Sequence, residues 1–121
     1  ANNLKVIDTI MESTTRLVAN EKSWRNKWKQ EKIKNIAMLL KGALAAENMV
    51  GLKMNLRRKN LRKTLVLLPA LNRPTLANLS DRGWLSLEII LAEQTVKELI
   101  PALKRIGAEK IIEYPLNKII Y

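Results

Sequence analysis

The chain has 121 residues, 47% of them hydrophobic and 27% charged. This composition is typical of one globular domain, or of a small domain with an appendage, and it excludes a disordered chain. The sequence contains no Cys and no His, which excludes disulfides, Cys-ligated zinc and His-dependent catalysis within these residues. No apolar run approaches the roughly 20 residues that span a bilayer, and no signal peptide opens the chain, so we expect a soluble, cytoplasmic protein without a membrane partner.

The net charge of +11 is unevenly distributed. Residues 21–63 hold thirteen Lys and Arg against three Glu, a net charge of +10. A basic half is the electrostatic signature of a protein that binds nucleic acid or another polyanion, and phosphate-bearing substrates such as ATP are a second explanation. Aromatic residues make up only 4% of the chain, and no helix-turn-helix, RNP or KH motif is present, which argues against nucleic acid as the partner.

The first half of the chain predicts two short strands and a long helix. Residues 5–12 are interpreted as a strand, with Val6 alternating against Asp8, and residues 14–19 are a candidate for a second strand. Asn20 is a good helix cap, and an apolar stripe with helical spacing predicts one helix over residues 23–48. We expect Trp24 and Trp28, which are four residues apart, to pack against apolar neighbours.

The second half alternates between strand and helix periodicity. The predicted strands are residues 51–56, 75–79, 84–91 and 109–114, and the predicted helices are residues 58–68 and 93–106. Pro69 ends the first of these helices, Pro101 should kink or shorten the second, and Gly107 is a natural C-terminal cap.

This order, strand–helix–strand repeated twice, predicts an α+β fold of the ferredoxin-like βαββαβ type. Both helices should cover one face of a four-stranded antiparallel sheet. The other face should carry Lys53, Asn55, Trp84, Ser86, Glu88 and Ile90. A Trp and an Ile among polar groups favour an interface or a ligand surface there over a bare solvent face.

No catalytic constellation is recognisable in the chain. No pair of carboxylates stands out, and the four scattered Gly residues form neither a GxGxxG nor a Walker pattern. The residues by themselves therefore indicate a ligand-binding or assembly module, without identifying the ligand.

Short, ordered motifs nevertheless resemble a known family. They are residues 3–19 (NLKVIDTIMESTTRLVA), 41–44 (KGAL), 51–55 (GLKMN), 67–69 (LLP), 73–75 (RPT), 83–84 (GW), 103–108 (LKRIGA) and 115–120 (PLNKII). In this order and spacing the whole chain resembles the C-terminal part of the long-form ATP phosphoribosyltransferases. That family joins ATP to phosphoribosyl pyrophosphate in the first step of histidine biosynthesis.

The resemblance implies three parts. Residues 1–20 would be the remnant of a catalytic domain, residues 21–48 a connecting helix, and residues 49–121 a ferredoxin-like regulatory domain that binds histidine. The loop that holds the phosphoribosyl pyrophosphate in the family would precede Ala1, so we expect a non-catalytic fragment of a larger enzyme. Mg²⁺ would serve the parent enzyme through groups outside this chain.

The resemblance also implies an allosteric histidine site. Carried over position by position, the site would comprise Asn55, Leu71, Thr75, Ile90 and Lys110. Some relatives have Asp where this chain has Asn55, and a neutral amide accepts a hydrogen bond about half as strongly as a carboxylate. Lys110 replaces a small residue and should crowd the pocket.

The expected partners are L-histidine and further copies of the chain, since the parent enzyme is expected to be a hexamer with histidine bound between regulatory domains. ATP and phosphoribosyl pyrophosphate would bind the catalytic part. Two alternatives remain open at this point. One is a structural oligomerisation domain without ligand binding, and the other is a basic nucleic-acid-binding module.

Overall fold

The computed structural model describes residues 5–69 and 73–121. The described chain divides after Ala37 into two units, which are treated separately below. No helix in the described ranges is long and apolar enough to cross a membrane.

Residues 5–20 of the first unit contain no strand. Residues 5–20 form neither helix nor strand and are exposed throughout, so the strands predicted at residues 5–12 and 14–19 are wrong. An alternating pattern forms a strand only where another strand satisfies its backbone groups, and residues 5–20 pair with no strand in the described chain. Helix α1 (Glu21–Arg25) follows, and the Asn20 side chain caps it by accepting a hydrogen bond from the Ser23 amide at 2.7 Å, as predicted.

The long helix predicted over residues 23–48 is interrupted at Asn26. Asn26 has extended backbone dihedrals, which end α1. Its side-chain oxygen then accepts a hydrogen bond from the Lys29 amide at 3.1 Å and so caps α2 (Lys27–Ala46). Asn competes well for backbone donors, which explains why it separates the two helices here.

The two Trp residues of this segment are not packed as expected. Trp24 is 45% and Trp28 68% exposed. Lysine ammonium groups lie over their rings instead, Lys34 at 6.0 Å from the Trp24 centroid and Lys32 at 5.7 Å from that of Trp28. These are exposed cation–π pairs.

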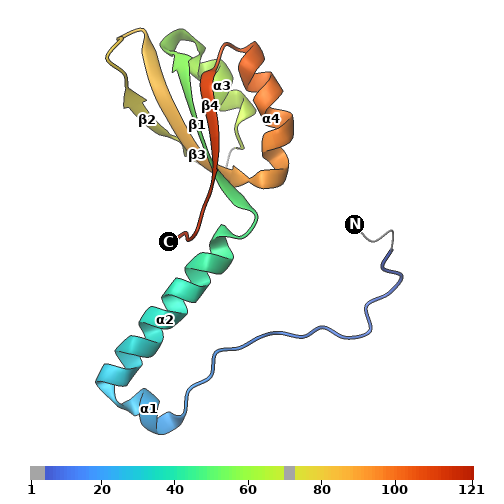
Figure 1. Ribbon diagram of the computed structural model, residues 1–121, viewed down its shortest axis with the longest axis vertical. Helices are drawn as coiled ribbons and strands as arrows, with labels where there is room; N and C mark the ends of the chain where they lie inside the picture. Colours follow the sequence, from blue (N-terminus) through green and yellow to red (C-terminus); the bar gives the residue numbers. More distant parts are fainter. Residues whose placement is uncertain (1–4, 70–72) are drawn as a thin grey trace. The chain divides into compact units, whose positions relative to one another are not determined.

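A four-stranded antiparallel sheet forms the second unit (Figure 1). In chain order its elements are β1 (Met49–Arg57), the 3-10 turn η1 (Arg58–Asn60), α3 (Leu61–Leu67), β2 (Thr75–Asn78), β3 (Trp84–Ala92), α4 (Glu93–Arg105) and β4 (Glu109–Pro115). The strand order is β2-β3-β1-β4. This is the predicted ferredoxin-like arrangement, and each strand lies within two residues of its predicted bounds.

The core lies between the sheet and the helix pair α3 and α4 (Figure 1). Alternate residues of the two central strands point into it, namely Val50, Leu52, Met54 and Leu56 from β1 and Leu85, Leu87, Ile89 and Leu91 from β3. Val96 and Leu103 of α4 complete its centre. The opposite face of the sheet, called the outer face below, carries the intervening residues.

Helix α4 continues through Pro101 to Arg105, so Pro101 does not shorten it, and the kink named as the other outcome stays a prediction. Proline removes one backbone donor from the helix, and packing of Val96 and Leu103 on either side of it outweighs that loss. Gly107 follows with φ +93°, the left-handed conformation predicted for a helix cap.

The C-terminal residues lie against the end of α2 that belongs to the second unit. The Ile119 amide donates a hydrogen bond to the Gly42 carbonyl at 2.9 Å. The Ile120 side chain occupies the space that a side chain at Gly42 would need. Glycine at this position therefore allows the tail to approach the helix backbone closely.

Candidate functional site

The outer face holds the six residues that were expected there, on β1 and β3. Its central pairs are Lys53 with Glu88, Asn55 with Ser86 and Gly51 with Ile90. Ser86 is only 7% exposed, whereas Ile90 is 38% exposed. The face therefore combines charged, polar and apolar side chains, which suits it for binding.

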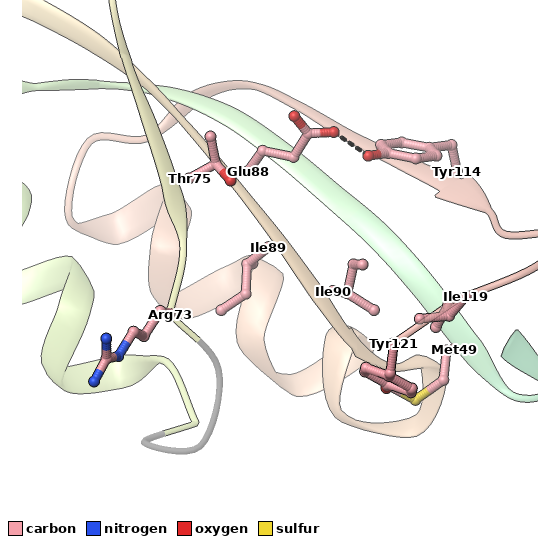
Figure 2. Close-up of a pocket in the computed structure, with 9 residues that line it drawn as sticks. All are labelled: Met49, Arg73, Thr75, Glu88, Ile89, Ile90, Tyr114, Ile119 and Tyr121. Carbon is pink, nitrogen blue, oxygen red and sulfur yellow. Dashed lines mark hydrogen bonds between the residues drawn. The ribbon is translucent and has the colours of Figure 1, made fainter. Parts of the chain in front are cut away.

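One side chain crosses this face from strand to strand. Tyr114 of β4 lies opposite Gly51 of β1, and its ring covers the glycine so closely that a Cβ there would overlap it. The Tyr114 hydroxyl reaches Glu88 on β3 and donates a hydrogen bond to its carboxylate (Figure 2). We call this arrangement the Tyr114–Glu88 strap.

The strap changes the acidity of the phenol. The hydrogen bond to the Glu88 carboxylate raises the pKa of Tyr114 above its usual value, and partial burial and the negative charge of Glu88 raise this pKa further. The phenol is the donor of this hydrogen bond, which fixes the orientation of the Glu88 carboxylate.

The strap borders a cavity of about 300 Å³ on the outer face. Its lining combines apolar side chains with one cation and one carboxylate (Figure 2): Met49, Arg73, Thr75, Glu88, Ile89, Ile90, Tyr114, Ile119 and Tyr121. Arg73 and Glu88 give the cavity both signs of charge, and Ile90 and Met49 give it apolar surface. Such a lining complements a small zwitterion that carries a flat or apolar side chain.

Of the five residues predicted for the histidine site, the four that the structure describes do not all line the cavity. Thr75 and Ile90 both line the cavity. Asn55 and Lys110 do not line it. Asn55 pairs with Ser86, which precedes Ile90 by four residues on β3, so Asn55 lies roughly 14 Å from Ile90 along the strand direction. Leu71 lies outside the described residues.

Lys110 sits in a bulge rather than in the cavity. Three residues of β4 beyond Glu109 bring the chain to Ile112, while β1 advances only two residues, from Asn55 to Lys53. Lys110 takes up the extra residue with φ +49° and is exposed. A bulge with a left-handed residue turns the strand locally. Lys110 does not line this cavity, and its crowding of a histidine site stays a prediction.

Glu88, Tyr114 and Arg73 are cavity residues that the prediction of the site missed. Glu88 was expected on the outer face, but its partner was not identified. The available signal was Gly51, because a glycine inside a strand indicates a bulge or a close approach by another group. Here the approaching group is the Tyr114 ring.

Metal ligation has no visible basis in residues 5–69 and 73–121. No three His, Cys, Asp or Glu side chains come together there in a way that would hold a metal ion.

Comparison with known families gives two matches along the chain. Residues 46–118 match the family described as HisG, C-terminal domain, and residues 1–42 match the family described as ATP phosphoribosyltransferase.

Curated relatives named ATP phosphoribosyltransferase align with 99% of the chain. The protein from Chlorobium phaeobacteroides is 53% identical over 120 residues, that from Thermodesulfovibrio yellowstonii 52%, and that from Pelotomaculum thermopropionicum 55%. The aligned region covers 41–42% of each relative, so the chain spans about two fifths of the length of the proteins it matches.

The sheet, its helix-covered inner face and its ligand-sized outer cavity define a ferredoxin-like domain of the kind that carries a binding surface on its open face. With the match over residues 46–118, the assignment becomes specific. The chain belongs to the HisG C-terminal domain family, the family of ATP phosphoribosyltransferase C-terminal domains.

Proposed function

We propose that this chain is the regulatory portion of an ATP phosphoribosyltransferase and that its outer face binds L-histidine as a feedback inhibitor. The parent enzyme would act in the cytoplasm and join ATP to phosphoribosyl pyrophosphate, releasing pyrophosphate, with Mg²⁺ neutralising the phosphates. The described residues offer no catalytic constellation of their own. Their role in this proposal is to bind the inhibitor and to transmit its binding.

The cavity on the outer face is the observation that carries this proposal. Arg73 offers a guanidinium for the carboxylate of an amino acid, and Glu88 offers an oriented carboxylate for an ammonium or an imidazole N–H. Ile90 and Thr75, two of the residues implied by the family resemblance, line the same space.

The second group, Asn55 and Lys110, supports a site shared between copies. Within one copy these residues lie too far from Ile90 to contact the same amino acid. The Asn55 side chain has no hydrogen-bond partner within residues 5–69 and 73–121, which leaves its amide available to a ligand or to a neighbouring copy. We therefore infer that histidine binds between two regulatory domains, with Thr75 and Ile90 from one and Asn55 from the other.

Isothermal titration of the 121-residue chain with L-histidine tests the binding step. Glu88→Gln should weaken binding about tenfold, because it replaces a charged acceptor by a neutral one. Glu98→Gln, on the exposed side of α4, is the matched control and should bind normally. Histamine, which lacks the carboxylate, should bind far more weakly than histidine. No heat at millimolar histidine, with circular dichroism showing a folded chain, contradicts the proposal.

Sedimentation tests the shared site. Histidine should shift the chain toward larger assemblies, and Asn55→Ala should reduce both this shift and the affinity. Full affinity in a strictly monomeric chain, or unchanged affinity in the Asn55→Ala variant, contradicts the contribution of a second copy.

A further inference from the structure

A second charged region lies at one end of the same sheet, away from the cavity. Five cations occur within the seven residues that end β1 and begin α3. With Arg82 of the β2–β3 hairpin they form what we call the basic end: Arg57, Arg58, Lys59, Arg62, Lys63 and Arg82. All six are exposed. The Arg58 amide donates a hydrogen bond to the Gly83 carbonyl at 2.9 Å, which holds the two segments side by side.

These six charges are not compensated by the protein. None of them forms an ion pair with an acidic side chain within residues 5–69 and 73–121. The acidic residue of the hairpin, Asp81, directs its carboxylate to the Gly83 amide at 2.7 Å. Like charges held this close repel one another and lower the stability of the folded domain, and a multivalent anion would remove that repulsion.

Arg58 is held in place before any ligand arrives. Its Nη2 donates to the Asn78 side-chain oxygen at 2.8 Å, and its Nε donates to the Arg82 carbonyl at 3.2 Å. A guanidinium has five N–H donors, so three remain for a ligand. Fixing the group in advance lowers the entropy cost of binding.

The same contacts outline an open hollow of about 570 Å³. Its lining is polar and basic and consists of Arg58, Asn78, Leu79, Ser80 and Arg82. Two arginines in the lining of one hollow match the oxygen atoms of phosphate groups, which arginine can contact with two parallel hydrogen bonds.

The aromatic residue at this end is not free to stack on a base. The Arg57 guanidinium lies over the Trp84 ring, 4.9 Å from its centroid, and the ring is half-buried. Binding of single-stranded nucleic acid relies on exposed aromatic platforms as well as on positive charge. The geometry therefore favours a compact anion over a nucleic acid strand.

We propose that the basic end binds an oligophosphate, with Arg58 and Arg82 as its anchors and Arg57, Lys59, Arg62 and Lys63 as the surrounding charge. Inorganic triphosphate and the triphosphate group of a nucleotide share this chemistry. The site is separate from the outer-face cavity and does not depend on histidine binding.

Titration of the full 121-residue chain with inorganic triphosphate tests the site, with ATP in a parallel arm. Similar affinities for the two would show that the phosphate chain alone is recognised, and tighter binding of ATP would show that the nucleoside contributes. Binding should raise the melting temperature and should weaken as chloride is added, because the attraction is between solvent-exposed charges. Sulfate at matched ionic strength should raise the melting temperature less.

Variants locate the site. Arg58→Gln should weaken triphosphate binding about tenfold. The double variant Arg62→Gln, Lys63→Gln leaves the hydrogen bonds of Arg58 intact and should weaken triphosphate binding less, about threefold. This second variant tests the proposal even if Arg58→Gln fails to fold. Lys97→Gln on α4 removes one exposed cation from another surface and should have no effect. The proposal is overturned if all three variants bind equally well, if Lys97→Gln loses as much affinity as Arg58→Gln, or if an RNA of about 12 nucleotides binds more tightly than triphosphate.

Discussion

Residues 5–12 and residues 51–56 were both predicted to be strands, but only residues 51–56 alternate strictly between apolar and polar side chains, and only they form a strand. The second segment belongs to β1, whose backbone pairs with β3 on one side and with β4 on the other. Helices α3 and α4 cover its apolar face. In residues 5–20 the apolar side chains stay exposed, Ile7 at 98%. The contrast teaches that a strand forms where strict alternation supplies an apolar face to bury and neighbouring strands pair with the backbone, and residues 5–12 have neither.

The most direct way to test this contrast is to remove the same kind of side chain from each region. Leu87 is fully buried in the core. Leu87→Ala should lower the free energy of unfolding by about 2–5 kcal/mol, because it removes buried apolar surface and leaves a cavity. Ile7→Ala should change it by less than about 0.5 kcal/mol. Urea denaturation measures both, and equal losses would show that residues 5–20 share a core with the rest of the chain.

The Tyr114–Glu88 strap allows the contribution of one contact on the outer face to be measured. Tyr114→Phe removes its hydrogen bond and should cost about 1 kcal/mol at neutral pH. Because the pKa of Tyr114 is raised in the folded chain, its contribution is complete below the unfolded value of 10.0 and is lost as the pH rises through the higher folded value. The difference between the wild type and the variant should therefore shrink at alkaline pH.

Urea denaturation at about pH 7 and about pH 11 measures this difference. Glu88→Gln keeps an acceptor for the phenol but removes the charge, so it should reduce the pH dependence. A difference between the wild type and Tyr114→Phe that grows above pH 10.0 would contradict the assignment.

The first unit should respond to a change in its helix cap only locally. Asn20→Ala removes the acceptor for the Ser23 amide and should destabilise α1 by about 0.5 kcal/mol. Amide exchange at Ser23 should become faster, while urea unfolding of residues 38–121 stays unchanged. Asn35→Ala, at an exposed position within α2, is the control and should leave exchange at Ser23 as it was.

The smallest expected effect is at Gly42, where two contributions oppose each other. Alanine favours the helix by about 1 kcal/mol. Its Cβ would also meet the Ile120 side chain and would lie 3.1 Å from the Ile119 carbonyl, which displaces the tail. The net change in stability for Gly42→Ala should stay below about 0.5 kcal/mol, with loss of amide protection at Ile119. Ala43→Gly, the exposed neighbour, should cost about 1 kcal/mol without affecting the tail.

The sequence was sufficient to predict the second unit because each of its signals is local and agrees with the others. Alternation in β1 and β3, the helical spacing of α4 and Gly107 as its cap all specify the same architecture. The interruption at Asn26 was missed because an apolar stripe with helical spacing outweighed a polar residue that supplies its own cap. The effect of Pro101 was overestimated because tertiary packing of α4 outweighs one lost backbone donor.

The candidate site was predictable only in part. Ile90 lies on the outer face as predicted, and it lines the cavity together with Thr75, a second residue of the predicted histidine site. Glu88 and Tyr114 are 26 residues apart in sequence, and their contact depends on the pairing of both strands with β1. No pattern along the chain encodes such a contact except the missing side chain at Gly51. The bulge at Lys110 could not be predicted from the sequence either, since a bulge depends on how β4 aligns with β1.

The Tyr114–Glu88 strap also acts as a check on strand alignment during folding. A slip of β4 by one residue against β1 would turn Tyr114 toward the helices and leave the groove above Gly51 empty. A slip of two residues would restore the face but would place the phenol opposite Lys53 in one direction and opposite Met49 in the other, where its ring would meet a long side chain. Only the native register places the ring over a glycine and within reach of the Glu88 carboxylate. The contacts of Tyr114 therefore favour this register over the neighbouring ones.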